Sequence, residues 1–328
     1  MINLEAPGEE VQSKIKENLL RHLQHLFDQN MSDFVFNPKK FPGSHPVSFT
    51  RDHLSGFSDY LVCEKSDGVR YLLFLPEIPN IRGLNDCQGF LIDRKNTFWR
   101  ITVSVPASVL KGHSLFDVEL VLDHGTDRRI LVFDTLFVCG VCFMHNNYWE
   151  RLQAAWYNLI YPVRESKIKS KRAIELYLKD FFRPSQIDFL WNQICPGLPH
   201  KCDGLIFTAV GGEYVVGTNQ NIVKWKPTEL NTLDFFVKNT NRGVYDLCTL
   251  SGRNHEKFAE MEVSEEIKEG SIVECYLEGD KWKIYKVRSD KLTENTTETA
   301  NRVLKSIKDN VEIEEIIQHF SVIKKVKS

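Results

Sequence analysis

Short strand-like runs separated by few helices dominate this chain, and they determine the fold class that it can adopt. Runs rich in β-branched and aromatic residues lie at 60–64, 69–75, 89–93, 99–105, 115–122, 130–138, 204–209, 214–216 and 221–225. Strands interleaved with few helices are typical of α+β proteins with largely antiparallel sheets. The sequence therefore predicts a first α+β domain of antiparallel sheets with flanking helices, at about residues 1–230.

A second set of short strands follows Pro227. Its apolar runs lie at 233–237, 244–250, 271–277 and 282–287. Because several short consecutive strands are typical of a small barrel, we predict a second, barrel-like domain at about residues 231–310.

Helical periodicity is confined to a few segments. Residues 9–28 carry apolar side chains at helical spacing, which predicts an amphipathic helix. Further helices are predicted at 147–160, 185–194, 297–308 and 311–320. The last of these could pack back on the first domain.

Composition excludes several classes of protein. With 42% hydrophobic and 26% charged residues, the 328-residue chain is typical of globular proteins, and its net charge of −2 excludes a passive, uniformly basic coat for nucleic acid. No apolar run reaches the length of a membrane span, and the N-terminus lacks a signal pattern, so we expect no membrane partner and a location in the cytosol or nucleus. The eight cysteines are then expected to be reduced.

The segment Lys65–Arg70 reads Lys-Ser-Asp-Gly-Val-Arg and lies between two apolar runs. A lysine at the edge of a sheet in this setting suits a nucleophile. With a reference pKa of about 10.4, lysine needs cationic neighbours or desolvation before it can react at neutral pH. Such cations are available later in the chain, at Lys224 and Lys226 and between Arg288 and Lys291.

Acids and an aromatic residue follow on predicted strands. Asp117 and Glu119 share one face because side chains alternate along a strand, Phe133 precedes an acid, and Asp203 begins an apolar run. Carboxylate oxygens are the ligands that Mg²⁺ prefers, and lysines and arginines neutralise phosphates. Each pattern alone more often marks a solvent-facing strand, but their combination in one order favours a nucleotide site.

This order resembles the covalent nucleotidyltransferase superfamily, and within it the eukaryotic mRNA capping guanylyltransferases. The resemblance rests on the lysine motif and on the segments FPGSHPVSF (41–49), KWKP (224–227) and NTLDF (231–235). It spans about residues 41–308 and implies a ligase-like nucleotidyltransferase domain followed by an OB-fold β-barrel. It departs from the family at Val118, where glycine is usual. We expect the Val118 side chain to point away from the acids.

The resemblance implies a role for each matched residue. Lys65 would attack the α-phosphate of GTP and hold GMP as a phosphoramidate, with Asp67 and Gly68 in the nucleotide-binding segment. Arg70 and Glu119 would contact the ribose, and Phe133 would stack on the guanine. Asp203, with Glu119 or Asp117, would bind Mg²⁺ or Mn²⁺.

The family's remaining roles concern phosphates and base choice. Lys224 and Lys226 would hold the α-phosphate, while Arg288, Asp290 and Lys291 would engage the departing pyrophosphate. Lys179 would read the guanine carbonyl, and Pro46, Val47 and Ser48 belong to the segment that is the alternative guanine reader.

The implied function is that of an mRNA guanylyltransferase, which passes GMP to a 5′-diphosphate RNA end. We expect a separate RNA triphosphatase, a phosphorylated RNA polymerase II tail as a partner, and a nuclear location. The rivals are a small ATP-dependent polynucleotide ligase and an inactive RNA-binding homologue. Cys139 and Cys142, with Cys195, His200 and Cys202, have zinc-like spacing, but core cysteines are favoured.

Overall fold

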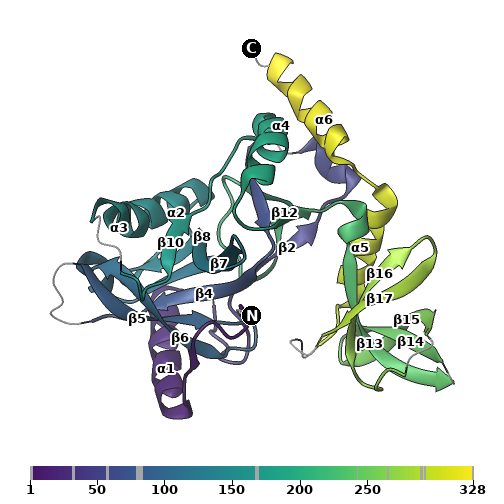
Figure 1. Cartoon of the computed structure of the whole chain (residues 1–328), viewed down its shortest axis with the longest axis horizontal. Coiled ribbons are helices and arrows are strands. Elements are labelled where there is room, and N and C mark those ends of the chain that lie inside the picture. Colours follow the sequence, from purple (N-terminus) through teal and green to yellow (C-terminus); the bar gives the residue numbers. More distant parts are fainter. Residues whose placement is uncertain are drawn as a thin grey trace. The chain divides into compact units, whose positions relative to one another are not determined.

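The computed structural model describes residues 3–31, 34–56, 59–78, 84–166, 170–241, 243–263, 266–288, 291 and 293–326. The chain forms two compact units. The first comprises Met1–Pro46, Ser58–Cys202 and Ile206–Ile222, and the second Val47–Phe57, Asp203–Leu205 and Val223–Ser328. Figure 1 shows the elements of both, and each unit is described by itself.

An eight-stranded sheet is the largest element of the first unit (Figure 1). Its strands run in the order β1-β6-β5-β4-β7-β8-β10, with β9 paired to β8. Their bounds are β1 Glu9–Glu10, β4 Val69–Leu75, β5 Leu84–Ile92, β6 Phe98–Pro106, β7 Ser114–Asp123, β8 Asp127–Val138, β9 Val141–Cys142 and β10 Glu175–Leu178. The pairings are antiparallel except that of β10 with β8. The predicted α+β class with largely antiparallel sheets is confirmed.

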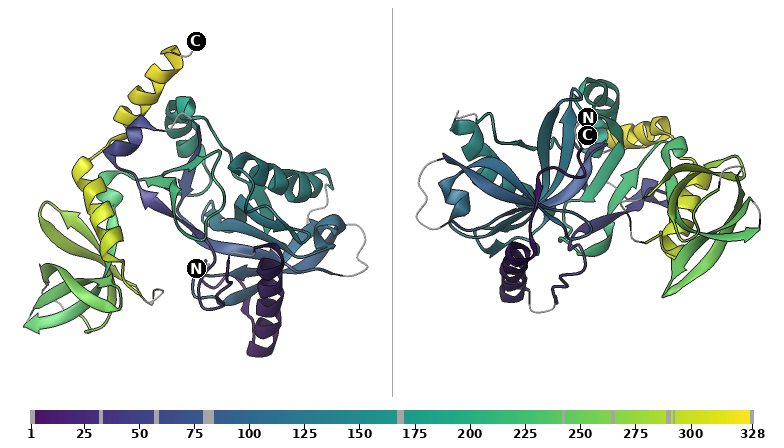
Figure 2. Two further views of the ribbon diagram at one scale, coloured as in Figure 1. Left: turned by 180° about the vertical axis from the view of Figure 1, so that it is seen from behind. Right: turned by 60° about the horizontal axis from the view of Figure 1, so that its bottom comes forward.

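Both faces of this sheet are buried, which explains why β4 is apolar at consecutive positions. Tyr71 and Leu73 pack into one core cluster and Leu72 and Phe74 into another, as the alternation of side chains along a strand requires. Helix α1 (Ser13–Asn30) covers the second face. The first is covered by the segment α2 (Tyr148–Ala155), η3 (Trp156–Ile160) and α3 (Tyr161–Glu165), as Figure 2 also shows.

A four-stranded sheet carries much of the candidate site. Its order is β2-β12-β11-β3, with β2 Ser44–Ser48, β3 Tyr60–Ser66, β11 Cys202–Ala209 and β12 Gly217–Trp225. The predicted strand at 214–216 is not formed. The short helical turns are η1 Arg51–Ser55, η2 Ala107–Leu110, η4 Pro184–Gln186, α4 Ile187–Phe189, η5 Leu190–Ile194, η6 Cys195–Gly197 and η7 Thr228–Leu230.

The second unit contains a five-stranded antiparallel sheet in the order β15-β14-β13-β16-β17. The bounds are β13 Thr232–Asn241, β14 Val244–Ser251, β15 Asn254–Glu262, β16 Ile272–Glu278 and β17 Lys281–Val287. Helix α5 (Thr297–Asp309) packs on its core through Ala300 and Val303, and α6 (Ile313–Val326) follows. The pairings leave β15 and β17 at the ends of the sheet, so they do not confirm the predicted closed barrel.

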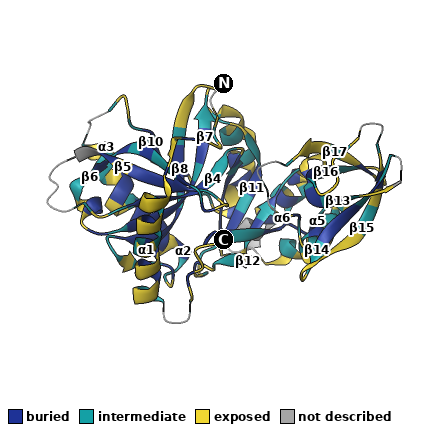
Figure 3. Cartoon of the chain, turned by 90° about the horizontal axis from the view of Figure 1, so that it is seen from below, coloured by how far each residue is buried: buried dark blue, intermediate teal, exposed yellow. Residues whose placement is uncertain are grey.

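The predicted helices exist, but their ends differ. Helix α1 begins at Ser13 and not at residue 9, because Glu9 and Glu10 pair with β6. The helix predicted at 147–160 continues to Glu165, and the reciprocal hydrogen bonds of Asn147 and Glu150 cap its start. Figure 3 shows buried strands in dark blue and the exposed side of α1 in yellow. No helix in the described part of the chain is long and apolar enough to cross a membrane.

Candidate active site

Lys65 lies in β3 between two buried residues. Glu64 and Ser66 are buried while Lys65 is partly exposed, as expected when neighbouring side chains point to opposite faces of a strand. The turn that follows is fixed by a hydrogen bond from Asp67 N to Lys201 O, at 2.8 Å. Gly68 is required there, because a Cβ atom would lie 2.5 Å from Leu120 O. The predicted motif therefore forms a tightly held strand end.

Lys179 holds the strand on both sides of Lys65. Its ammonium lies 2.8 Å from Glu64 O, 2.9 Å from Ser66 Oγ and 3.1 Å from Glu64 Oε1. Burial acts to lower the pKa of Lys179, but nearby negative groups, including Glu64 and Glu119, outweigh burial and raise it. Lys179 is thus a buried cation whose three N–H donors face protein acceptors.

Glu64 also faces His200, which sequence reasoning considered only as a zinc ligand. His200 Nε2 lies 3.7 Å from Glu64 Oε1, and His200 Nδ1 lies 3.2 Å from Asp123 Oδ1. Burial acts to lower the pKa of His200, and the two carboxylates raise it above its ordinary value. A connected set of charges therefore lies behind the strand that carries Lys65.

Arg70 forms a buried, bidentate ion pair with Asp117. Its Nε lies 2.8 Å from Asp117 Oδ1 and its Nη2 2.5 Å from Oδ2, while Nη1 donates to Ser44 O at 2.5 Å. The Tyr214 hydroxyl donates to Asp117 Oδ2 at 2.6 Å. Asp117, predicted as an alternative metal ligand, therefore has both oxygens engaged by protein donors. Val118 packs into the core, away from these groups, as predicted.

Glu119 is opposite Arg70 in the β4–β7 pairing and is only partly buried. Burial raises the pKa of Glu119, and the cations Lys179, Lys65 and Arg70 oppose that shift. The predicted ribose contacts, Arg70 and Glu119, thus lie side by side on neighbouring strands.

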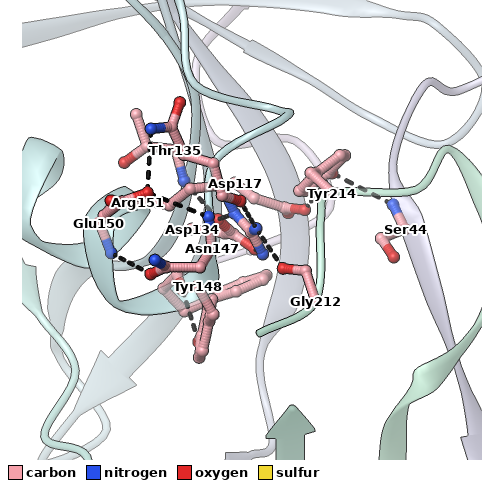
Figure 4. A network of polar contacts seen from close by, with 12 residues as sticks. Ser44, Asp117, Asp134, Thr135, Asn147, Tyr148, Glu150, Arg151, Gly212 and Tyr214 are labelled. Atoms are coloured by element: carbon pink, nitrogen blue, oxygen red, sulfur yellow. Dashed lines mark hydrogen bonds and ion pairs between the residues drawn. The ribbon is translucent and has the colours of Figure 1, made fainter. Parts of the chain in front are cut away.

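Phe133 is held from two sides. The Tyr148 hydroxyl donates to Phe133 O at 2.9 Å, and the next residue, Asp134, forms a buried ion pair with Arg151 at 2.7 and 3.1 Å (Figure 4). The Arg70 guanidinium lies 5.5 Å from the centre of the Phe133 ring. The aromatic residue predicted to stack on a base is therefore partly exposed on a rigid support.

Asp203 and Lys226 pair with each other in the second unit. Lys226 Nζ lies 2.6 Å from Asp203 Oδ2. Gly204 is required between the strands, because a Cβ atom would lie 2.1 Å from Trp225 O. Phe49 N donates to Lys224 O at 2.8 Å. Asp203 and Gly204 both lie within strand β11, as the apolar run that follows them predicted.

The segment with Pro46, Val47 and Ser48 forms most of β2. Val47 and Ser48 are buried, whereas Pro46 is partly exposed. The structure therefore gives this segment a well-defined backbone, with little side-chain surface beyond Pro46 for a contact with a base.

The basic residues predicted to engage pyrophosphate are held by acids. Arg288 Nη1 lies 3.1 Å from Asp234 Oδ1 and 3.1 Å from Glu274 Oε2, and the Lys291 ammonium also contacts Asp234. Asp290 lies outside the described residues. Asp234 belongs to the NTLDF segment, so this segment contacts two of the residues predicted to engage pyrophosphate.

The cysteines do not form a metal site in the described part of the chain. No group of three or more His, Cys, Asp or Glu side chains is arranged there to hold a metal ion. Cys139 Sγ lies 3.1 Å from Ser108 O, and Cys195 and Cys202 are free thiols with their sulfurs 3.8 Å apart. Cys139 and Cys142 are partly buried and pack against the two core clusters of the first unit, in agreement with the favoured prediction of core cysteines.

Sequence reasoning missed Tyr214 and Arg151. Residues 214–216 were read as a strand, yet Tyr214 is buried beside Asp117. Arg151 lies on the buried face of a predicted helix, where an arginine is expected only with a partner, and that position was the available signal.

Comparisons with known proteins cover nearly the whole chain. The family model described as mRNA capping enzyme, catalytic domain, matches residues 1–228, and that described as mRNA capping enzyme, C-terminal domain, matches residues 214–317. The mRNA-capping enzyme subunit alpha of Schizosaccharomyces pombe is 34% identical over 330 residues, covering 88% of this chain and 82% of that protein. The protein of the same name from Saccharomyces cerevisiae is 28% identical, covering 85% and 78%.

Two further similarities are to a mammalian capping enzyme and to a solved structure. The mRNA-capping enzyme of Mus musculus is 29% identical, covering 83% of this chain and 48% of that protein. Among solved structures, a mycobacterial DNA ligase D complexed with ATP covers 78% of this chain and 97% of its own, at 13% identity and a TM-score of 0.43.

Proposed function

The chain belongs to the mRNA capping enzyme family and is an mRNA guanylyltransferase, and we propose that Lys65 is its nucleophile. The Lys65 amine attacks the α-phosphorus of GTP, a P–N bond forms, and the bond to the β-phosphate oxygen breaks. Pyrophosphate leaves and the amine loses a proton. In the second step a β-phosphate oxygen of 5′-diphosphate RNA attacks the same phosphorus, the P–N bond breaks, and the product is a GpppN cap.

One observation carries the assignment of Lys65. Lys179 binds Glu64 and Ser66, the residues on both sides of Lys65, so the strand is fixed where a reacting amine needs a defined direction. The partly exposed Lys65 side chain then has access to a substrate, while its neighbours are buried.

Nucleoside binding is assigned to the residues around β4 and β8. Arg70 and Glu119 would contact the ribose, with Asp67 and Gly68 shaping the turn beside them. Phe133 would stack on the base. Lys179 would donate a hydrogen bond to guanine O6, for which it must give up one of its three protein acceptors. The segment with Pro46, Val47 and Ser48 remains the alternative group that recognises guanine.

The phosphates are assigned mainly to cations, and three of these, Lys226, Arg288 and Lys291, pair with acids in the structure. Lys224 and Lys226 would hold the α-phosphate, and Arg288, Asp290 and Lys291 the pyrophosphate. Lys226 pairs with Asp203, and Arg288 pairs with Asp234 and Glu274, so a bound phosphate would compete with these carboxylates for the cations.

We propose Mg²⁺ or Mn²⁺ as the divalent metal, with carboxylates as its protein ligands. Mg²⁺ is usually bound by one or two carboxylates together with substrate phosphates, so a group of three protein ligands is not required. Asp203 and Glu119 would hold it, whereas Asp117 is engaged by Arg70 and Tyr214. The metal would neutralise charge on the phosphates.

The wider context is also proposed. Several relatives are named subunit alpha, which supports a separate subunit, and we assign the RNA triphosphatase step to that protein. The phosphorylated tail of RNA polymerase II is the proposed docking partner and the nucleus the proposed location.

Incubation with α-labelled GTP or ATP and Mg²⁺, followed by denaturing electrophoresis, tests the function. We expect much more label on the protein from GTP than from ATP. More label from ATP than from GTP would indicate a polynucleotide ligase, and no label from either nucleotide would indicate an inactive RNA-binding homologue.

A further inference from the structure

Tyr214 joins two parts of the proposed nucleoside site. Its hydroxyl donates to Asp117 Oδ2 at 2.6 Å and accepts a hydrogen bond from Ser44 N at 3.1 Å (Figure 4). Burial and the Asp117 charge raise the pKa of Tyr214 well above its ordinary value, so the hydroxyl keeps its proton and remains a donor. One side chain thus links the carboxylate that holds Arg70 to the start of β2.

The direction of the Arg70 guanidinium depends on these contacts. A guanidinium has five N–H donors, and three of them are used by Asp117 and Ser44 O. The group also lies 5.6 Å from the centre of the Phe41 ring. Within the described part of the chain the other two N–H donors have no hydrogen-bond partner, so they could contact a ligand. Their direction is set by the guanidinium plane, which the bonds to Asp117 and Ser44 fix.

Tyr214 is itself held from behind. Its backbone N donates to Met144 O at 2.8 Å, and the Arg151 guanidinium lies 5.8 Å from the centre of its ring. Arg151 Nη1 also donates to Gly212 O at 2.7 Å, two residues before Tyr214. Three contacts therefore hold the segment that carries the hydroxyl, and Figure 4 shows Arg151, Gly212 and Tyr214 among the residues of this network.

We propose that Tyr214 is a positioning residue for ribose recognition: through Asp117 and Ser44 it sets the direction in which Arg70 meets the ribose hydroxyls. This proposal rests on the proposed assignment of Arg70 to the ribose. Tyr214 itself does not touch the substrate in this account.

The test compares ribose discrimination in Tyr214→Phe and in the parent protein. Both are made in a Lys65→Ala background, so that binding is measured without chemistry. Calorimetry with Mg²⁺ and GTP, 2′-deoxy-GTP or 3′-deoxy-GTP gives the dissociation constants. We expect Tyr214→Phe to weaken GTP binding about tenfold, as for a bond to a charged group, and to reduce the preference for GTP over the deoxy nucleotides. Equal weakening of all three nucleotides, or no change, would overturn the proposal.

Tyr71→Phe is the matched control. Tyr71 is also buried, and its hydroxyl donates to Leu4 O at 2.7 Å, outside the ribose contacts. We expect it to leave ribose discrimination unchanged, whatever its effect on stability. Altered discrimination in Tyr71→Phe would show that loss of any buried tyrosine hydroxyl has this effect, which contradicts the proposal.

A double-mutant cycle provides a second test. If Tyr214 acts in part through Asp117, Tyr214→Phe should weaken GTP binding less in an Asp117→Asn background than in the native sequence. Fully additive losses would contradict the proposal. Labelling of the Lys65 protein with GTP is measured separately, so failure of the proposed chemistry is distinguished from failure of this inference.

Discussion

At the scale of single residues, the site is built from charges that other charges hold in place. Lys179 is fixed by Glu64 and Ser66, and Arg70 by Asp117. Buried ions of this kind are tolerated only with partners, and removing one partner leaves the other uncompensated. Each substitution in the site therefore tests both a contact with the nucleotide and a contact within the protein.

Lys179→Ala separates these two roles. If Lys179 reads guanine O6, its loss removes a charge-assisted bond worth about 1.5–3 kcal/mol, so use of GTP should fall roughly tenfold to hundredfold and its advantage over ATP should narrow. Steady-state labelling with both nucleotides measures this. Phe133→Ala should impair both nucleotides alike, and exposed Lys171→Ala should change neither. An equal fall with GTP and ATP in Lys179→Ala would mean that the lysine only holds the strand beside Lys65.

His200 predicts a dependence of stability on pH. Its pKa in the folded protein is raised by Glu64 and Asp123, so its stabilising effect is fully present below the ordinary histidine pKa of about 6.5. The effect is lost as pH rises through the raised folded value. The difference in unfolding free energy between the native protein and His200→Gln should therefore be largest near pH 6 and should shrink toward pH 9. Urea unfolding at both pH values measures it, and a difference that grows with pH would contradict the assignment.

At the scale of secondary structure, sequence pattern predicted the elements whose side chains face a core. Strand β4 was found because both its faces are buried and its residues are apolar. Strand β15 was missed because most of its side chains are exposed and polar, and pairing with β14 alone places it in the sheet. Tyr214 was wrongly predicted to lie in a strand. An apolar run alone does not distinguish a strand from a loop in which a buried tyrosine hydroxyl makes hydrogen bonds.

The close approach of β11 to β12 gives a prediction about stability. In Gly204→Ala the new Cβ would meet Trp225 O, so the backbone must shift, and such overpacking typically costs about 1–3 kcal/mol. Gly211→Ala is the control, since nothing lies within 4 Å of its Cβ position. Denaturant unfolding should show a loss of stability in the first variant only. Equal stability of both variants would mean that the strands separate at no cost.

At the scale of the whole molecule, the order of motifs was more informative than any single motif. The predicted nucleophile, acids and cations occupy segments that two family models cover together. Sequence could predict Lys65, Arg70 and Asp203 as site residues from their type and order. It could not show that both carboxylate oxygens of Asp117 accept hydrogen bonds from Arg70 and Tyr214. Arg70 is 47 positions from Asp117 in the sequence, and Tyr214 is 97 positions from it. Local periodicity carries no information on such contacts.

The central claim, that Lys65 carries GMP, is tested most directly by labelling with α-labelled GTP and Mg²⁺. Lys65→Arg keeps the charge but cannot attack, since a guanidinium is effectively never deprotonated. The account predicts that the native protein and the control Lys171→Arg retain label after denaturing electrophoresis, and that Lys65→Arg, folded as judged by circular dichroism, retains none. Label on Lys65→Arg comparable to that on the native protein would contradict the claim and place the nucleophile elsewhere.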